Sequence, residues 1–206
     1  MKTRWNGELV WGALLCTLIT GMALISLVYL PYDYNGIDSA HRFAPAGPQH
    51  LFGTDNLGRD VFSRIMAGSR YTLLLALLTV TGSAAIGSLL GLAAGFAGGV
   101  PDEVTMRLMD ALSSFPGILL ALVMVALMGN GEGSLFIALL VLFIPSFVRI
   151  VRSGTLQYKT KDFVLMAQIM GASRFRILFL HILPNLIPSL LSASVLGLSN
   201  AILAEA

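Results

Sequence analysis

Five long apolar runs without a single charge constrain the fold of this chain more than any other feature. They contain no Asp, Glu, Lys, Arg or His and cover residues 9–30, 71–98, 111–128, 134–148 and 186–204. A helix needs about 20 apolar residues to cross the hydrocarbon core of a bilayer, where a charge is costly. Because 56% of the residues are hydrophobic and only 12% are charged, we expect an all-α integral membrane protein, a polytopic helical bundle with about five transmembrane helices.

The polar segments between these runs divide the chain into three parts. Residues 1–30 hold a short polar stub and the first span, residues 31–70 form a long loop, and residues 71–206 form the core. In the core, we expect residues 102–110 to form a polar connection before the third span. Pro145 is expected to kink the fourth span.

The long loop also has local structure of its own. Thr54 or Asp55 can start a helix, and Asp60 and Arg64 are spaced as an i,i+4 ion pair. We therefore expect a short helix here that lies along the membrane surface.

The distribution of Lys and Arg predicts the orientation. With a cytoplasmic N-terminus, nine of the thirteen Lys and Arg residues fall on the inner side, as the positive-inside rule requires. We therefore expect residues 31–70 to be extracytoplasmic. The inner residues are Lys2, Arg4, Arg107, Arg149, Arg152, Lys159, Lys161, Arg174 and Arg176.

Glycine recurs at every fourth position along the second span and beyond it. Such a face of small residues lets two helices approach closely in lipid, where packing drives helix association. We expect this face to pack against another helix rather than to line a pore. Its residues are Gly87, Gly91, Gly95 and Gly99.

Residues 161–185 contain an apolar run that is too short to cross a bilayer. As a helix, Phe163 to Met170 would be about 12 Å long, against a hydrocarbon core of about 30 Å. Asp162 can cap this helix, Gly171 can break it in a left-handed conformation, and Ser173 can cap a second helix. The pattern predicts a helix, a glycine turn and a second helix, with an apolar surface that a partner covers.

Ala167 and Gly171 are the two small residues in this bulky run, one helical turn apart. We expect them to share a face toward the partner, because small side chains permit close approach. The alternative is a re-entrant or interfacial hairpin that only pads the protein.

The sequence shows no chemistry of its own that could drive transport or catalysis. It lacks the phosphate-binding pattern G-x-x-x-x-G-K-[ST], its one cysteine lies in an apolar run, and its three histidines are scattered. We therefore expect no catalytic, cofactor or metal site and no enzyme activity. The net charge of +2 is too small to indicate nucleic acid. A motor must come from another subunit.

The segment MGASRFRILFLHILPN, residues 170–185, resembles the cytoplasmic Glu-Ala-Ala (EAA) loop of ABC-importer permease subunits. That pattern runs Glu-Ala-Ala, three residues, Gly, and an Ile-Leu-Pro ending. Ala167, Gly171 and residues 182–184 match it, whereas Leu165 and Met166 replace the Glu and the first Ala. Two further segments resemble the permeases of the dipeptide, oligopeptide and nickel branch. They are FGTDNLGRDVFSR at residues 52–64 and MRLMDALSSFP at residues 106–116.

The resemblance implies a permease subunit in a bacterial or archaeal inner membrane that forms half of a translocation pathway for di- or oligopeptides. Its implied partners are a second homologous permease, two ATP-binding subunits, an extracytoplasmic substrate-binding protein and membrane lipid. Residues 153–184 would contain the coupling helix, and a sixth family span would be missing after Ala206. The implied coupling residues are Asp162, Phe163, Leu165, Ala167, Gly171, Ala172, Ser173, Ile182 and Pro184.

Other functions remain open at this point. The same architecture could import nickel or a metal chelate. More distant alternatives are a channel or carrier that needs no ATPase, and a membrane assembly factor. The sequence does not distinguish pairing with an identical permease from pairing with a different one.

Overall fold

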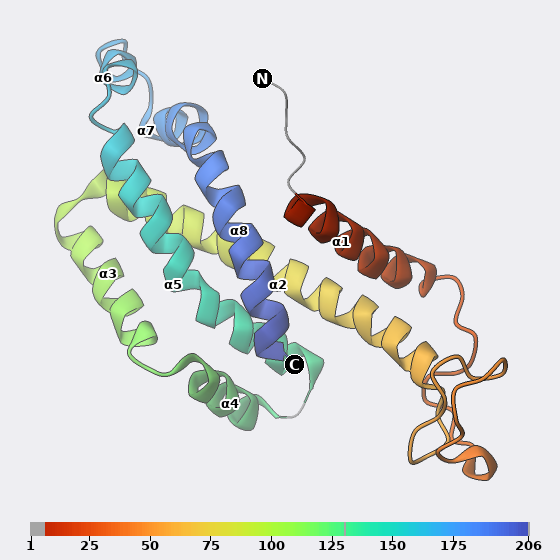
Figure 1. The fold of residues 1–206 in the computed structure, drawn as a ribbon. Coiled ribbons are helices and arrows are strands. Elements are labelled where there is room, and N and C mark those ends of the chain that lie inside the picture. The colour runs from red at the N-terminus through yellow and green to blue at the C-terminus, as the bar shows by residue number, and fades with distance from the viewer. Residues whose placement is uncertain (1–6, 130, 206) are drawn as a thin grey trace. The chain divides into compact units, whose positions relative to one another are not determined.

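The computed structural model describes residues 7–129 and 131–205, and it is built from helices (Figure 1). In these residues no strand is present, and the one β-bridge joins Thr54 to Asp60. The predicted all-α membrane fold is thus confirmed. The helices are α1 (Gly7–Ile25), η1 (Ser39–His41), α2 (Val61–Ala97), α3 (Gly99–Ser113), α4 (Gly117–Met128), α5 (Glu132–Tyr158), α6 (Asp162–Ile169), α7 (Arg174–Arg176), the π-helix η2 (Ile177–Ile182) and α8 (Leu183–Glu205).

Several of these helices can cross a membrane. Four are long and apolar enough, and a fifth candidate is the pair α3 and α4, which is bent by 88°. The bend lies at Pro116, which precedes α4 and has no N–H to continue α3. The third span predicted for residues 111–128 is therefore broken, and residues 102–110 belong to helix α3 rather than to a polar connection. Helix α5 continues through Pro145.

The chain forms two compact units, residues 1–74 and residues 75–206. In the first unit, Asp55 organises the loop. Its carboxylate accepts hydrogen bonds from the backbone N–H of Leu57 and Arg59, and it pairs with Arg59 at 2.7 Å and Arg64 at 2.5 Å. Burial of Asp55 opposes its ionisation, but these donors outweigh burial and hold its pKa well below the usual range. Arg64 thus pairs with Asp55, and the predicted pair with Asp60 is wrong.

Asp60 instead starts a transmembrane helix. Its carboxylate accepts a hydrogen bond from the N–H of Ser63 at 2.7 Å and pairs with His50 at 3.0 Å. Because Asp60 caps the helix at this point, α2 begins at Val61 and runs without a break to Ala97. The separate surface helix predicted from Thr54 or Asp55 is therefore wrong.

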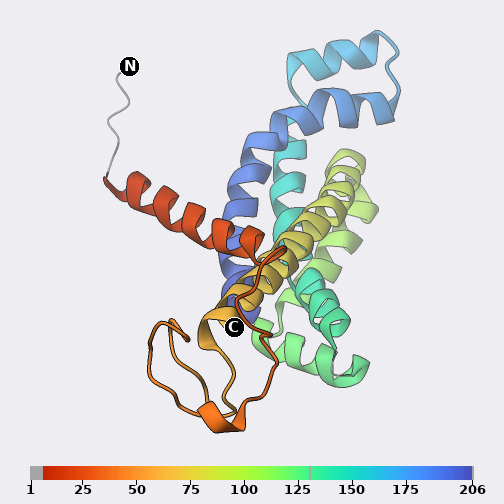
Figure 2. The same cartoon turned by 90° about the vertical axis from the view of Figure 1, so that its right-hand side faces the viewer.

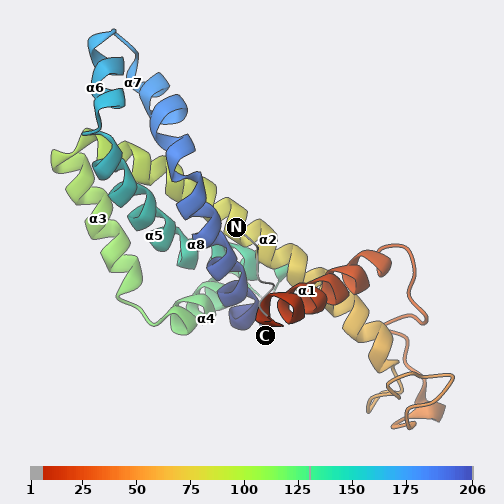
Figure 3. The ribbon, with the colours of Figure 1, turned by 45° about the horizontal axis from the view of Figure 1, so that its top comes forward.

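In the second unit, α5 is the central helix and contacts α3, α4 and α8 (Figures 1 and 3). The part of α2 from residue 75 onward also packs on α5, and Ser83 donates a hydrogen bond to the carbonyl of Leu140 at 2.9 Å. A Cβ on Gly87 would lie 2.5 Å from the Cβ of Phe147. The two helices are therefore closer than any larger residue at this position would allow.

Gly91 and Gly95 continue this close contact. A Cβ on Gly91 would lie 2.7 Å from the carbonyl oxygen of Val148, and one on Gly95 would lie 2.9 Å from the Cβ of Thr155. Gly99 does not belong to this face, contrary to the expectation from the repeat. Helix α2 has already ended, Gly99 has a φ of +58°, and a Cβ there would meet no described atom within 4 Å.

We predict that Gly91→Leu and Gly95→Leu each destabilise the protein strongly. The added side chain would meet α5 backbone or side-chain atoms at 3.0 Å or less, so the helices would have to separate. Thermal unfolding of the purified variants in detergent measures the effect. Gly12→Leu is the matched control, because a Cβ at Gly12 meets nothing within 4 Å. Wild-type stability of both test variants would contradict the packing role.

Candidate functional site

The candidate site is the helix–turn–helix formed by α6 and α7, which lies at the end of the second unit where α5 ends and α8 begins (Figures 1 and 2). Gly171 has a φ of +77° and makes the turn, as predicted. Ser173 caps α7, and its Oγ accepts a hydrogen bond from the N–H of Arg176 at 3.3 Å, also as predicted.

The predicted capping role of Asp162 is wrong. The N-cap of α6 is Lys161, no side chain caps the helix, and Asp162 is the first helical residue. A carboxylate in the first turn still favours the helix through its dipole, so Asp162 stabilises α6 by a different route.

Helix α6 has one face that packs inward. Val164 is fully buried and Ala167 packs beside it, so the helix is fixed to the rest of the unit. Their neighbours come from α2, α5, the π-helix and α8. The buried members of this cluster are Leu92, Val151, Val164, Ile177, Ile182 and Leu186.

The opposite face of α6 exposes large apolar side chains. Met166, Ile169 and Met170 are 61%, 79% and 86% exposed, and Phe163 and Leu165 are also exposed. We call these five residues the exposed face of α6. The apolar run that contains Met166, Ile169 and Met170 was expected to meet a partner, but these three were not among the predicted coupling residues, although their i, i+3, i+4 spacing indicates a shared face.

The predicted coupling residues do not all lie on one surface. Asp162, Gly171, Ser173 and Pro184 are exposed together with Phe163 and Leu165, but Ala167 and Ala172 are half-buried and Ile182 is fully buried. Ala167 is half-buried and packs against the buried cluster, and its contact with a partner stays a prediction. A Cβ on Gly171 would meet no described atom within 4 Å, so a substitution there would act through backbone strain.

A π-helix joins this site to the last span. The N–H of Leu183 donates to the carbonyl of Leu178, five residues earlier. Pro184 has no N–H for the carbonyl of Leu180, which disfavours regular α-helical bonding here. The amide of Asn185 donates to the carbonyl of His181 at 2.7 Å. The backbone from α7 to α8 is thus continuously helical.

Polar contacts connect the end of α5 to α2 and α3. Arg152 forms two hydrogen bonds with the carboxylate of Asp102, one of them at 2.7 Å, and Arg149 pairs with Asp110 at 2.9 Å. The Nζ of Lys159 donates to the carbonyl of Gly95 at 2.9 Å. Because α6 follows α5 after three residues, these contacts also hold the base of the site. Lys159 thus has a structural role. Its position in a polar segment of the sequence did not indicate this role.

A family described as the inner membrane component of binding-protein-dependent transport systems matches residues 87–206, more than half of the chain. The chain belongs to this family. It is a multi-pass inner-membrane transport permease of the ABC-importer class. The matched residues include the whole of α6, α7 and α8 and the part of α2 that packs closely on α5.

Curated relatives of this permease carry peptide-transport names. The probable D,D-dipeptide transport system permease protein DdpC of Escherichia coli strain K12 is 35% identical, over all of this chain and 72% of its own length. The oligopeptide permease OppC of Bacillus subtilis strain 168 is 33% identical, over all of this chain and 68% of its own length. The glutathione permease GsiD of Pectobacterium atrosepticum is 39% identical over 88% of this chain, which spans 60% of that relative.

We predict that Asp102→Asn destabilises the permease by about 1–3 kcal/mol, because it weakens two charge-assisted hydrogen bonds that Arg152 makes across α3 and α5. Thermal unfolding in detergent would show the loss. Glu103→Gln is the control: Glu103 is the next residue on the same helix, and its ion pair with Arg107 is exposed and should contribute little. Equal effects of both changes would contradict a special role for Asp102.

Proposed function

We propose that this chain is the transmembrane permease subunit of an ATP-driven peptide importer and that α6 and α7 couple it to an ATPase subunit. The exposed face of α6 carries the proposal. A soluble end of a membrane protein would not leave Met166, Ile169 and Met170 in water, because contiguous exposed apolar surface marks an interaction site. Methionine side chains adapt to the shape of a partner, which suits an interface that moves.

The packing of α6 on the rest of the unit supports a role for this helix in transmitting force. Val164 and Ala167 fix its inner face in the buried cluster, and α7 continues through the π-helix into α8. A push on the exposed face would therefore displace packed helices rather than a loose loop. The chain supplies no phosphate-binding motif of its own, so ATP hydrolysis belongs to the partner.

The proposed orientation places this end in the cytoplasm. Lys161, Arg174 and Arg176 are exposed around the site, and the positive-inside rule favours such a site on the cytoplasmic side. When the bent pair α3 and α4 counts as one span, the N-terminus lies on the same side. The loop of residues 31–60 becomes extracytoplasmic, where a substrate-binding protein would deliver the cargo. A second permease would complete the translocation pathway, as the resemblance of the loop after α5 to the EAA loop implies.

Peptides are the proposed cargo. The relatives quoted above are named for transport of dipeptides, oligopeptides and glutathione, which all contain peptide or amide-linked amino-acid units. These names favour peptides over the nickel or metal-chelate alternative.

We predict that Met170→Asp and Ile169→Asp each reduce co-purification of the ATPase subunits and peptide uptake by roughly tenfold or more, because a charge buried in an apolar contact is costly. Both side chains are exposed in the permease, so its own folding should be unchanged. The measurements are a pull-down of the complex and uptake of a labelled dipeptide in cells.

Two controls separate coupling from folding. Lys161→Gln alters an exposed residue beside α6 and should leave both readouts near the wild-type level. Ala167→Asp alters the inner face and should reduce the amount of folded permease instead. If the Met170 and Ile169 variants bind the ATPase and transport normally, α6 is not the coupling element.

A second prediction concerns the orientation. In a Cys16→Ser background, a cysteine at exposed Ser39 should react with a membrane-impermeant thiol reagent in intact cells. A cysteine at exposed Lys161 should react only after permeabilisation. The reverse pattern would invert the topology and place α6 out of reach of any cytoplasmic ATPase.

A further inference from the structure

A pocket lies beside the candidate site, on residues that the exposed face of α6 does not include. It has a volume of about 400 Å³, within the range of small-ligand sites. Four elements and the turn after α6 contribute to its wall. The lining residues are Phe96, Ala97, Gln168, Ala172, Arg174 and Ile177.

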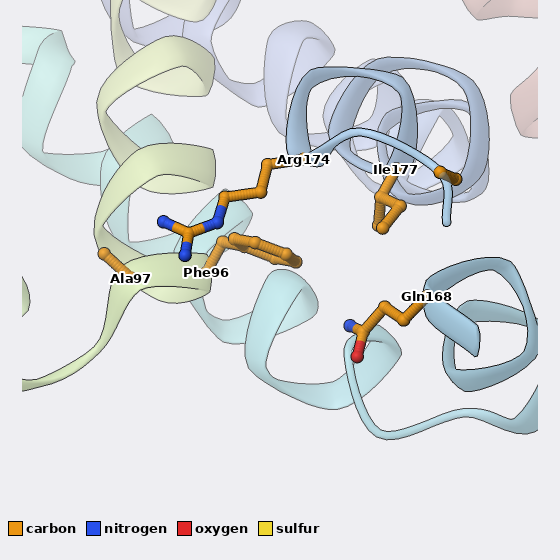
Figure 4. Close-up of a pocket in the computed structure, with 6 residues that line it drawn as sticks. Phe96, Ala97, Gln168, Arg174 and Ile177 are labelled. Atoms are coloured by element: carbon orange, nitrogen blue, oxygen red, sulfur yellow. The ribbon is translucent and has the colours of Figure 1, made fainter. Parts of the chain in front are cut away.

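The polar groups of the pocket come from opposite walls. Figure 4 shows the side chain of Arg174 extending from α7 toward the end of α2 at Phe96 and Ala97, with Gln168 reaching into the same space from α6. Within the described part of the chain, the guanidinium of Arg174 has no ion pair or hydrogen bond. A guanidinium offers five donors in a fixed plane and matches a phosphate well, so the pocket favours an anion with phosphate geometry.

The pocket lies where two candidate membrane spans end. The span candidate α2 ends at Ala97, and the last span candidate begins at Arg174. Basic pockets between the cytoplasmic ends of membrane spans bind anionic phospholipid headgroups, and in the orientation proposed above this pocket lies at such an end. Phe175, the next residue after Arg174, contacts Phe179 with ring centroids 4.3 Å apart.

We propose that this pocket binds the headgroup of one anionic phospholipid, with Arg174 holding the phosphate and Gln168 donating a hydrogen bond to a headgroup hydroxyl. The apolar wall at Phe96, Ala97 and Ile177 then contacts the glycerol and the first methylene groups. A lipid bound there bridges the end of α2 and the start of α7. Anionic lipid would thus brace the coupling element from the membrane side.

Native mass spectrometry of the purified permease tests this directly, with phosphatidylglycerol as the probe and phosphatidylcholine as the comparison. The wild type should retain one tightly bound phosphatidylglycerol in preference to phosphatidylcholine. Arg174→Gln should lose roughly tenfold in affinity, because a hydrogen bond to a charged group is lost. Ala97→Trp should lose binding as well, because it fills the pocket without changing the charge.

Arg176→Gln is the matched control. It removes the same charge two residues away, outside the pocket, and should retain the lipid. Equal losses in the Arg174 and Arg176 variants would show diffuse attraction and overturn the site. Displacement of the lipid by millimolar inorganic phosphate would show a simple anion site and also overturn it. If Arg174→Gln loses the ATPase but keeps the lipid, Arg174 contacts the protein partner and the proposal fails, whatever the outcome for the Met170 and Ile169 variants.

Discussion

The close approach of α2 and α5 is the constraint on which the rest of the second unit depends. In a bilayer the lipid tails are as apolar as the helix surfaces, so no hydrophobic effect drives two helices together. Their association therefore relies on packing contacts between the helices. One face of α2 has no side chains at Gly87, Gly91 and Gly95, which allows this close contact. A Cβ at any of the three positions would overlap with α5. With α5 held in this way, α3, α4 and α8 all pack on it.

The contact between α2 and α5 also positions the candidate site. Lys159 at the end of α5 donates to the carbonyl of Gly95, and Val164 on α6 packs against Leu92 and Val151 from the two helices. The base of α6 is therefore positioned by the spans, while its other face remains exposed. A coupling element needs both properties, since it must take up a displacement at its surface and pass it on through packed contacts.

The sequence indicated much of the local structure correctly, for identifiable reasons. Gly171 and Ser173 act within a few residues of themselves, so their turn and cap could be predicted. The prediction failed for Asp60 and Arg64, where i,i+4 spacing suggested a pair. Arg64 instead pairs with Asp55 and Asp60 with His50, because the folded loop brings these stronger arrangements within reach. The spacing of two residues along one helix does not show whether a loop residue competes for the same ion pair.

Charge-free length and the pattern of positive charges determined the membrane class, the helical fold and the expected orientation, because the bilayer imposes these on any chain of such composition. The tertiary structure alone decided which face of α6 is available. Ala167 and Met170 belong to the same short apolar run, yet Ala167 is half-buried against the buried cluster and Met170 is 86% exposed. The difference depends on which side of α6 meets α2, α5 and α8, and these neighbours are too distant in the sequence for the spacing within α6 to identify the buried side.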